Sequence, residues 1–129
     1  MLELLNRIIY GIISSLIKDD EKAAGVYLNF VQDKNIDNEK SYIVYSNESC
    51  IPFYDFRYSR AVYQVSIYSQ DLEHALSLQR KIGVHFNDLR KKFNDIEICG
   101  CDISNEHYEY SEGYNCYQAV SLIAILYKF

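Results

Sequence analysis

The stretch that decides the fold is Ala61-Val-Tyr-Gln-Val-Ser-Ile-Tyr68, which is followed by Ser69-Gln-Asp71 and Leu72. Every second residue from Ala61 to Ile67 is apolar, and this period of two predicts a strand with one face on a core. Asp71 belongs to the residue types that favour a helix N-cap. The sequence therefore predicts a strand over 61–68 that turns directly into a helix beginning near Leu72.

The predicted second helix extends from Leu72 to Phe93. Apolar residues recur in this range at three- and four-residue steps, which is typical of an amphipathic helix. Asp71 and Glu73 lie at its positive end and the basic run 90–92 at its negative end, which suits the helix dipole.

A first amphipathic helix is predicted over residues 2–17, where Leu and Ile recur at helical spacing up to a polar break at 18–22. Glu3, Asn6 and Arg7 interrupt the apolar run, which is also too short to span a bilayer. A helix lying on a membrane surface would carry more Lys and Arg. We therefore expect a core helix and no membrane contact.

The remaining predicted strands are rich in β-branched and aromatic residues. They cover 26–31, 41–45, 96–110 and 115–127, with a bulge expected at Gly100 and a hairpin turn at 111–113. The sequence predicts a single domain over 1–129 of the α+β class: an antiparallel or mixed sheet of four to five strands with two main helices packed on one face.

Composition narrows the function. The formal net charge of −5 argues against a general nucleic-acid binder, although it is compatible with DNA passing nearby. The chain has 13 Tyr and no Trp. Tyr suits protein interfaces, and it also simply favours strands, so both explanations stay open.

No catalytic, cofactor or metal site is expected from the motifs. Cys99 and Cys101 form C-x-C within a strand and not the usual zinc spacing. His74 and His85 are separated by about 16 Å on one helix, too far to share a metal. Neither G-x-S-x-G nor a phosphate-binding glycine loop is present. The clustered carboxylates, Glu106, Glu109 and Glu112 among them, are interpreted as solvated.

One long connection, 46–58, stands out because it carries several aromatic residues around Pro52. Exposed aromatics in a long loop indicate contacts with a partner. The alternatives are a lid folded over the sheet or an edge strand. The predicted protein-interface residues are Ile51, Phe53, Tyr54, Phe56, Arg57 and Tyr58.

Three segments carry a resemblance to a known family: the N-terminal amphipathic helix, the strand 61–68 that runs through S-Q-D-L into E-H-A-L-S-L-Q-R-K-I, and the strand A-V-S-L-I-A-I-L-Y at 119–127. Y-I-V-Y at 42–45, followed by an irregular stretch, fits the same order. This pattern of elements, spread over nearly the whole chain, resembles the tail terminator and tail completion proteins of long-tailed bacteriophages and phage-tail-like particles.

The resemblance implies a hexameric ring that caps the tail tube and joins it to the head connector, without enzyme chemistry or a cofactor. The implied partners are further copies of the chain, the tube protein and the head–tail connector or neck protein. DNA would pass through the lumen without specific binding. The implied location is the virion tail or a phage-tail-like particle, with synthesis in the bacterial cytoplasm.

Other functions remain open at this point. A head–tail neck (stopper) protein is the nearest alternative, and a small non-viral adaptor that binds proteins is the second. An enzyme with a site shared between subunits has no support in the motifs, and one chain cannot reveal such a site.

Overall fold

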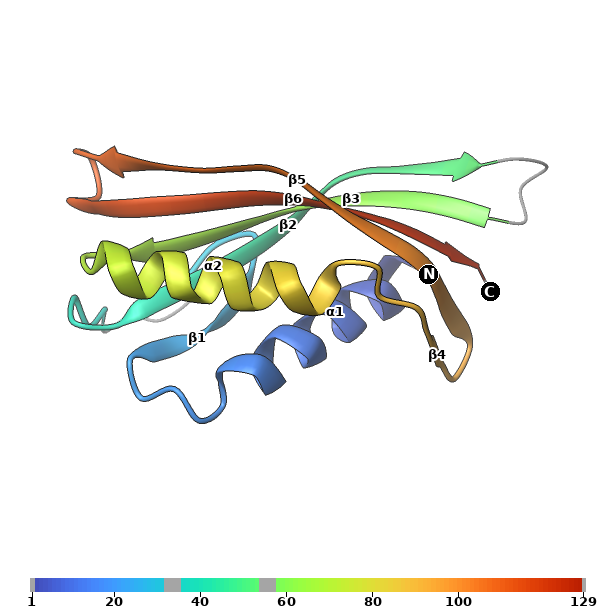
Figure 1. Ribbon diagram of the computed structural model, residues 1–129, viewed down its shortest axis with the longest axis horizontal. Coiled ribbons are helices and arrows are strands. Elements are labelled where there is room, and N and C mark those ends of the chain that lie inside the picture. The colour runs from blue at the N-terminus through green and yellow to red at the C-terminus, as the bar shows by residue number, and fades with distance from the viewer. Residues whose placement is uncertain (1, 32–35, 54–57, 129) are drawn as a thin grey trace.

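The computed structural model describes residues 2–31, 36–53 and 58–128, in which two helices lie against one face of a mixed sheet (Figure 1). The helices are α1 (Leu2–Ile17) and α2 (Leu72–Phe86). The strands are β1 (Ala23–Leu28), β2 (Ser41–Phe53), β3 (Tyr58–Ser69), β4 (Lys91–Phe93), β5 (Ile96–Ser111) and β6 (Cys116–Lys128). Across the sheet their order is β1-β2-β3-β6-β5-β4, with β1 parallel to β2 and the other neighbours antiparallel.

The core lies between the helices and the two central strands, β3 and β6. Every second residue of β3 from Ala61 to Ile67 is buried toward the helices, as the alternation predicted. In α1 the buried residues follow one another at four-residue steps, from Leu5 to Ile17. The amphipathic stripe and the strand therefore meet face to face, which is the packing that fixes the domain.

Helix α2 begins where the sequence predicted and ends earlier. The Asp71 carboxylate caps it by accepting a hydrogen bond from the His74 amide at 3.2 Å. The predicted continuation to Phe93 is wrong, because Asn87 is extended and Asp88 has a left-handed φ of 58°. Asn and Asp adopt such conformations more readily than most residues, so they stop a helix whose apolar pattern continues.

The sheet has six strands, one more than the four to five predicted. The additional strand is β4, a three-residue segment that was predicted as the end of the second helix. It pairs with the start of β5, from Lys91 opposite Ile98 to Phe93 opposite Ile96. A strand this short has no recognisable period, and only its partner reveals it.

The predicted long connection over 46–58 is wrong for most of its length. Strand β2 continues to Phe53 and pairs with β3 from Tyr42 opposite Tyr68 to Phe53 opposite Tyr58. The alternative of an edge strand agrees better with the structure. These residues form a strand because β3 pairs with them. The predicted strand 26–31 differs in its bounds: β1 covers Ala23–Leu28 and ends before Asn29, which has a φ of 69°.

The β5–β6 hairpin is confirmed. Its register shifts between Ile98 and Gly100, as the glycine predicted, and again between Ser104 and His107. None of the described helices is long and apolar enough to cross a membrane.

Candidate protein-interaction surfaces

The β2–β3 hairpin forms an arm that extends past both helices (Figure 1). Strand β1 pairs with β2 only as far as Tyr45, so the arm has no described strand on its outer edge. Ile51 lies on this arm opposite Arg60 and is 55% exposed. The structure brings the backbones of Phe53 and Tyr58 together as the last described pair. The other predicted interface residues lie outside the described residues: Tyr54, Phe56 and Arg57.

A shallow hollow of about 640 Å³ lies where β6 ends, at the same end of the molecule as the arm. Its lining includes four cationic residues, Arg90, Lys91, Lys92 and Lys128. Among the described residues of the lining, Glu97 is the one carboxylate; it pairs with Lys128 at 3.2 Å, an interaction that raises the pKa of the Lys128 ammonium. We call this surface the basic hollow.

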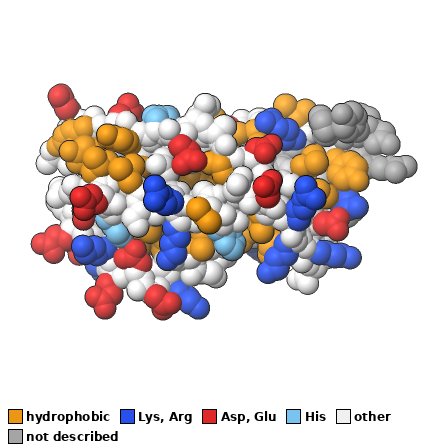
Figure 2. Space-filling model, in the orientation of Figure 1, with side chains coloured by type: hydrophobic (Ala, Val, Ile, Leu, Met, Phe, Trp, Pro, Cys, Tyr) orange, Lys and Arg blue, Asp and Glu red, His pale blue; other side chains and the backbone are white. Residues whose placement is uncertain are grey.

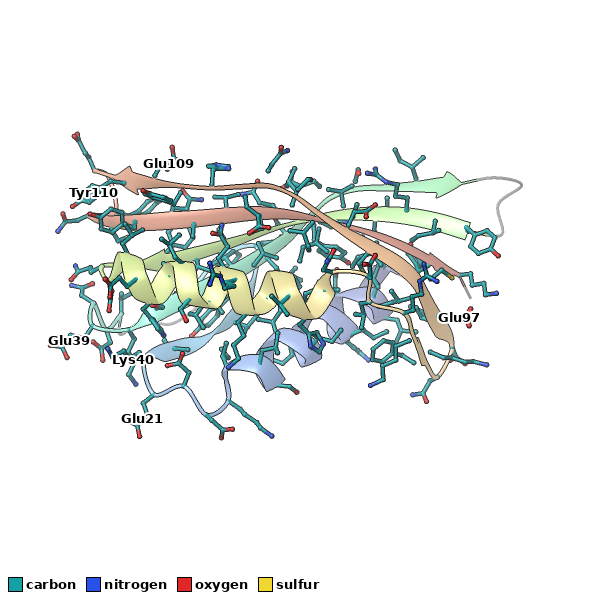
Figure 3. All side chains as sticks on the ribbon, viewed as in Figure 1. Glu21, Glu39, Lys40, Glu97, Glu109 and Tyr110 are labelled. Atoms are coloured by element: carbon teal, nitrogen blue, oxygen red, sulfur yellow. The ribbon has the colours of Figure 1, made fainter. Side chains whose placement is uncertain are left out.

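The turn of the β5–β6 hairpin lies at the opposite end of the molecule. Glu109 and Glu112 are exposed there, together with the half-exposed ring of Tyr110. Figure 3 shows Glu109 and Tyr110 at this end. Figure 2 shows hydrophobic side chains gathered at this end with carboxylates beside them. The sequence has no Lys or Arg from Asp102 to Tyr127, and Lys128 lies at the far end of β6. We call Glu109, Tyr110, Glu112 and Tyr114 the acidic tip.

An apolar hollow of about 440 Å³ lies beside the acidic tip. Tyr42 and Tyr68 form the pair next to the buried Ile43–Ile67 pair. Because neighbouring residues of a strand point to opposite faces, the two tyrosines point to the face without helices. The Tyr68 ring meets the Tyr114 ring edge-on with 5.9 Å between centroids, and Phe30 adds an exposed ring to the lining. Exposed rings around a concave surface suit an apolar side chain from a partner protein.

Four polar side chains from four separate segments form a partly buried network that we call the polar clasp: Asp20, Ser41, Ser69 and His74. His74 Nδ1 lies 2.5 Å from Ser41 Oγ, and His74 Nε2 lies 2.8 Å from the Asp20 carboxylate. The Ser41 hydroxyl donates to Ser69 Oγ at 2.8 Å. The clasp thereby joins the α1–β1 turn, the start of β2, the end of β3 and the first turn of α2.

Serine, histidine and aspartate in a row are also the components of a hydrolase triad, so the geometry matters. In a triad the serine must be open to a substrate, and its partner is His Nε2. Here Ser41 is fully buried and faces Nδ1, while Nε2 faces the acid. The arrangement satisfies buried polar groups and ties the sheet to α2, as hydrogen-bonded networks do in a core.

The clasp was not predicted from the sequence. His74 was considered only together with His85, and no motif links Asp20, Ser41, Ser69 and His74 across the chain. The available signal was local: Ser41 and Ser69 are polar residues at the ends of strands, where a side chain can meet a helix terminus.

The clasp predicts a pH dependence. The hydrogen bond from His74 is the largest of the effects that hold the pKa of Asp20 below its usual value; the Lys22 amide and the charge of Lys81 act in the same direction. A carboxyl whose pKa is lowered by folding stabilises the protein above its unfolded pKa, and this contribution is lost as pH falls through the folded pKa. We expect wild-type stability to fall below about pH 4 more steeply than that of Asp20→Asn. Urea unfolding from pH 6 to pH 3 measures this, and equal slopes would contradict it.

No group of three or more His, Cys, Asp or Glu side chains is placed to hold a metal ion within the described ranges. The four cysteines are unpaired. Burial raises the pKa of the Cys101 thiol to about 12, which keeps it protonated at neutral pH.

Comparison with known proteins shows a similar fold in solved structures. No family model matches the chain, and no curated protein matches it. Nineteen chains of solved structures match. One belongs to the structure described as "Virion of native gene transfer agent (GTA) particle", with a TM-score of 0.65 and 9% identity. The two chains share a fold. The likeness covers 92% of this chain and 85% of that one.

Proposed function

We propose that this chain is a structural protein of a phage-like particle and, within it, the tail terminator: a hexameric ring that caps the tail tube and joins it to the head connector. The observation that carries the proposal is the fold shared with a virion chain over 92% of this chain. Such a role requires no covalent chemistry and no cofactor. It places the protein in the tail after synthesis in the bacterial cytoplasm.

The surfaces of the molecule support a role in assembly. The arm, the basic hollow and the acidic tip are three different candidate contact surfaces at two ends of the molecule. A ring subunit needs two unlike surfaces for its neighbours, because head-to-tail contacts close a ring. It also needs a surface for the tube, to which the apolar hollow is suited. DNA passes through such a ring without being bound, in keeping with the net charge of −5.

The proposal predicts that the protein stops tube growth. Purified protein added to polymerising tube protein of the same particle is expected to give short, capped tubes with a ring of about six protomers at one end. Electron microscopy measures tube length, and light scattering measures the mass of the protein alone and in the mixture. A protein that stays monomeric in both, with tubes of unchanged length, would contradict the proposal.

A matched pair of variants tests the arm. Ile51→Glu changes an exposed apolar residue of the arm, and Val84→Glu changes one on α2 that is 73% exposed. We expect only Ile51→Glu to reduce ring formation or tube capping, since a charge in an apolar contact must be desolvated. A protein that binds the head connector but leaves tube length unchanged would instead be a neck protein.

A further inference from the structure

The acidic tip and the basic hollow lie at opposite ends of the same strand. Strand β6 begins beside the tip at Cys116 and ends at Lys128, which lines the hollow. Its 13 residues span roughly 40 Å at about 3.3 Å per residue. Charges at this distance are screened from each other, because the Debye length is about 8 Å at physiological ionic strength. The tip and the hollow of one chain therefore do not interact.

The two surfaces are complementary in charge. The described lining of the hollow carries Arg90, Lys91, Lys92 and Lys128 against one carboxylate, that of Glu97, which pairs with Lys128. The tip carries Glu109 and Glu112, and the sequence has no Lys or Arg from Asp102 to Tyr127 on its hairpin. Opposite potentials on two patches steer proteins together and fix the orientation of their contact.

The two surfaces are also complementary in shape and in chemistry. The tip is a convex hairpin turn with two exposed rings, Tyr110 and Tyr114. The hollow is concave and includes Leu126 and the ring of Tyr58, over which the Lys128 ammonium lies at 5.6 Å. Tyrosine rings with flanking carboxylates suit such a lining, because rings pack on apolar surface and attract cations.

We propose that the acidic tip of one copy of this chain docks in the basic hollow of a second copy. The contact joins unlike surfaces, so each bound copy leaves a free tip and a free hollow for the next. Resting on the proposed function, this contact is the one that links neighbours in the ring. The partner is a second copy because the two surfaces share one chain and match each other.

Charge reversal tests the contact with purified full-length protein. Glu109→Lys/Glu112→Lys makes the tip basic, and Arg90→Glu/Lys91→Glu makes the hollow acidic. Each variant alone is expected to lose association on the order of 10- to 100-fold, since like charges then face each other. Sedimentation velocity gives the mass of each species, and 1 M salt, with a Debye length of about 3 Å, is expected to weaken the wild-type assembly.

Recombining the reversals makes the test specific. A chain with all four substitutions is expected to assemble again, because a basic tip then meets an acidic hollow. An equimolar mixture of the two variants is also expected to assemble, through alternating contacts that close only even-numbered rings. The matched controls are Glu21→Lys/Glu39→Lys and Lys18→Glu/Lys22→Glu, which change the net charge equally at exposed sites elsewhere and are expected to assemble as the wild type does.

The outcomes separate this proposal from the proposed function. A wild-type ring whose mass is unchanged by either reversal, or a mixture that fails to recover, overturns the tip–hollow contact alone. A ring that depends on the contact but does not stop tube growth overturns the terminator role alone. A wild type that is monomeric at every concentration, with and without tube protein, overturns both.

Discussion

Replacement of Phe86 by Ala is expected to lower the free energy of unfolding by about 3 to 5 kcal/mol. Phe86 is the last residue of α2, is fully buried and belongs to the cluster that joins the helices to the sheet. Its removal loses the burial of a large ring and leaves a cavity that the surrounding strands cannot fill. Urea unfolding followed by circular dichroism measures the change.

Val84 provides the control for this prediction. It lies two residues earlier on the same helix, where it is 73% exposed and so has little packing to lose. Val84→Ala is expected to change the free energy of unfolding by no more than about 0.5 kcal/mol. Equal losses for the two variants would show that the end of α2 is not packed as described.

Replacement of His74 by Ala is expected to cost about 2 to 3 kcal/mol of stability. The side chain is mostly buried and bridges the Ser41 hydroxyl and the Asp20 carboxylate. Its removal takes one hydrogen bond from the buried Ser41 hydroxyl and one from the Asp20 carboxylate. A buried polar group that loses its partner costs more than an ordinary hydrogen bond contributes. Thermal and urea unfolding at neutral pH measure this loss.

His85→Ala is the matched control, since this histidine lies on the same helix and is exposed. We expect its effect to stay within about 0.5 kcal/mol. The loss of stability on Asp20→Asn is also expected to be smaller in His74→Ala than in the wild type, because the bond between the two side chains is already gone and only the effects of the Lys22 amide and Lys81 remain. A full additional loss on Asp20→Asn would contradict the clasp.

The parts of the fold that the sequence predicted are those in which local pattern and tertiary packing agree. The strand over 61–68 alternates because one face meets the helices, and Asp71 caps α2 by a bond within its own turn. The β5–β6 hairpin followed from two strand-like runs with a short turn between them. In each case the residues that carry the signal are neighbours along the chain.

The parts that were missed depend on partners far along the chain. Strand β2 extends to Phe53 because β3 pairs with it, and β4 exists because β5 lies beside it. The apolar pattern that extended α2 to Phe93 was real, since Leu89 and Phe93 pack on the core from outside the helix. The spacing of apolar residues indicates which side chains are buried. It does not determine whether the backbone that bears them is a helix or a strand.

The candidate site divides in the same way. Glu109 and Glu112 belong to the clustered carboxylates of the sequence and were interpreted as solvated. In the single chain both are exposed, as this interpretation requires. The proposed contact of these carboxylates also depends on the basic hollow, which β6 places at the far end of the sheet. The importance of the polar clasp likewise arises from the approach of Asp20, Ser41, Ser69 and His74, which the sequence separates widely.

The strand order also constrains when the protein acquires its structure during synthesis. Strand β6 lies between β3 and β5, although it is the last of the strands to leave the ribosome. Until β6 emerges, β3 and β5 have no strand between them to pair with. The apolar residues of both strands then lack the neighbours that β6 provides in the core. The sheet therefore closes only after translation of this segment, and a nascent chain that stalls earlier exposes strand edges on which aggregation begins.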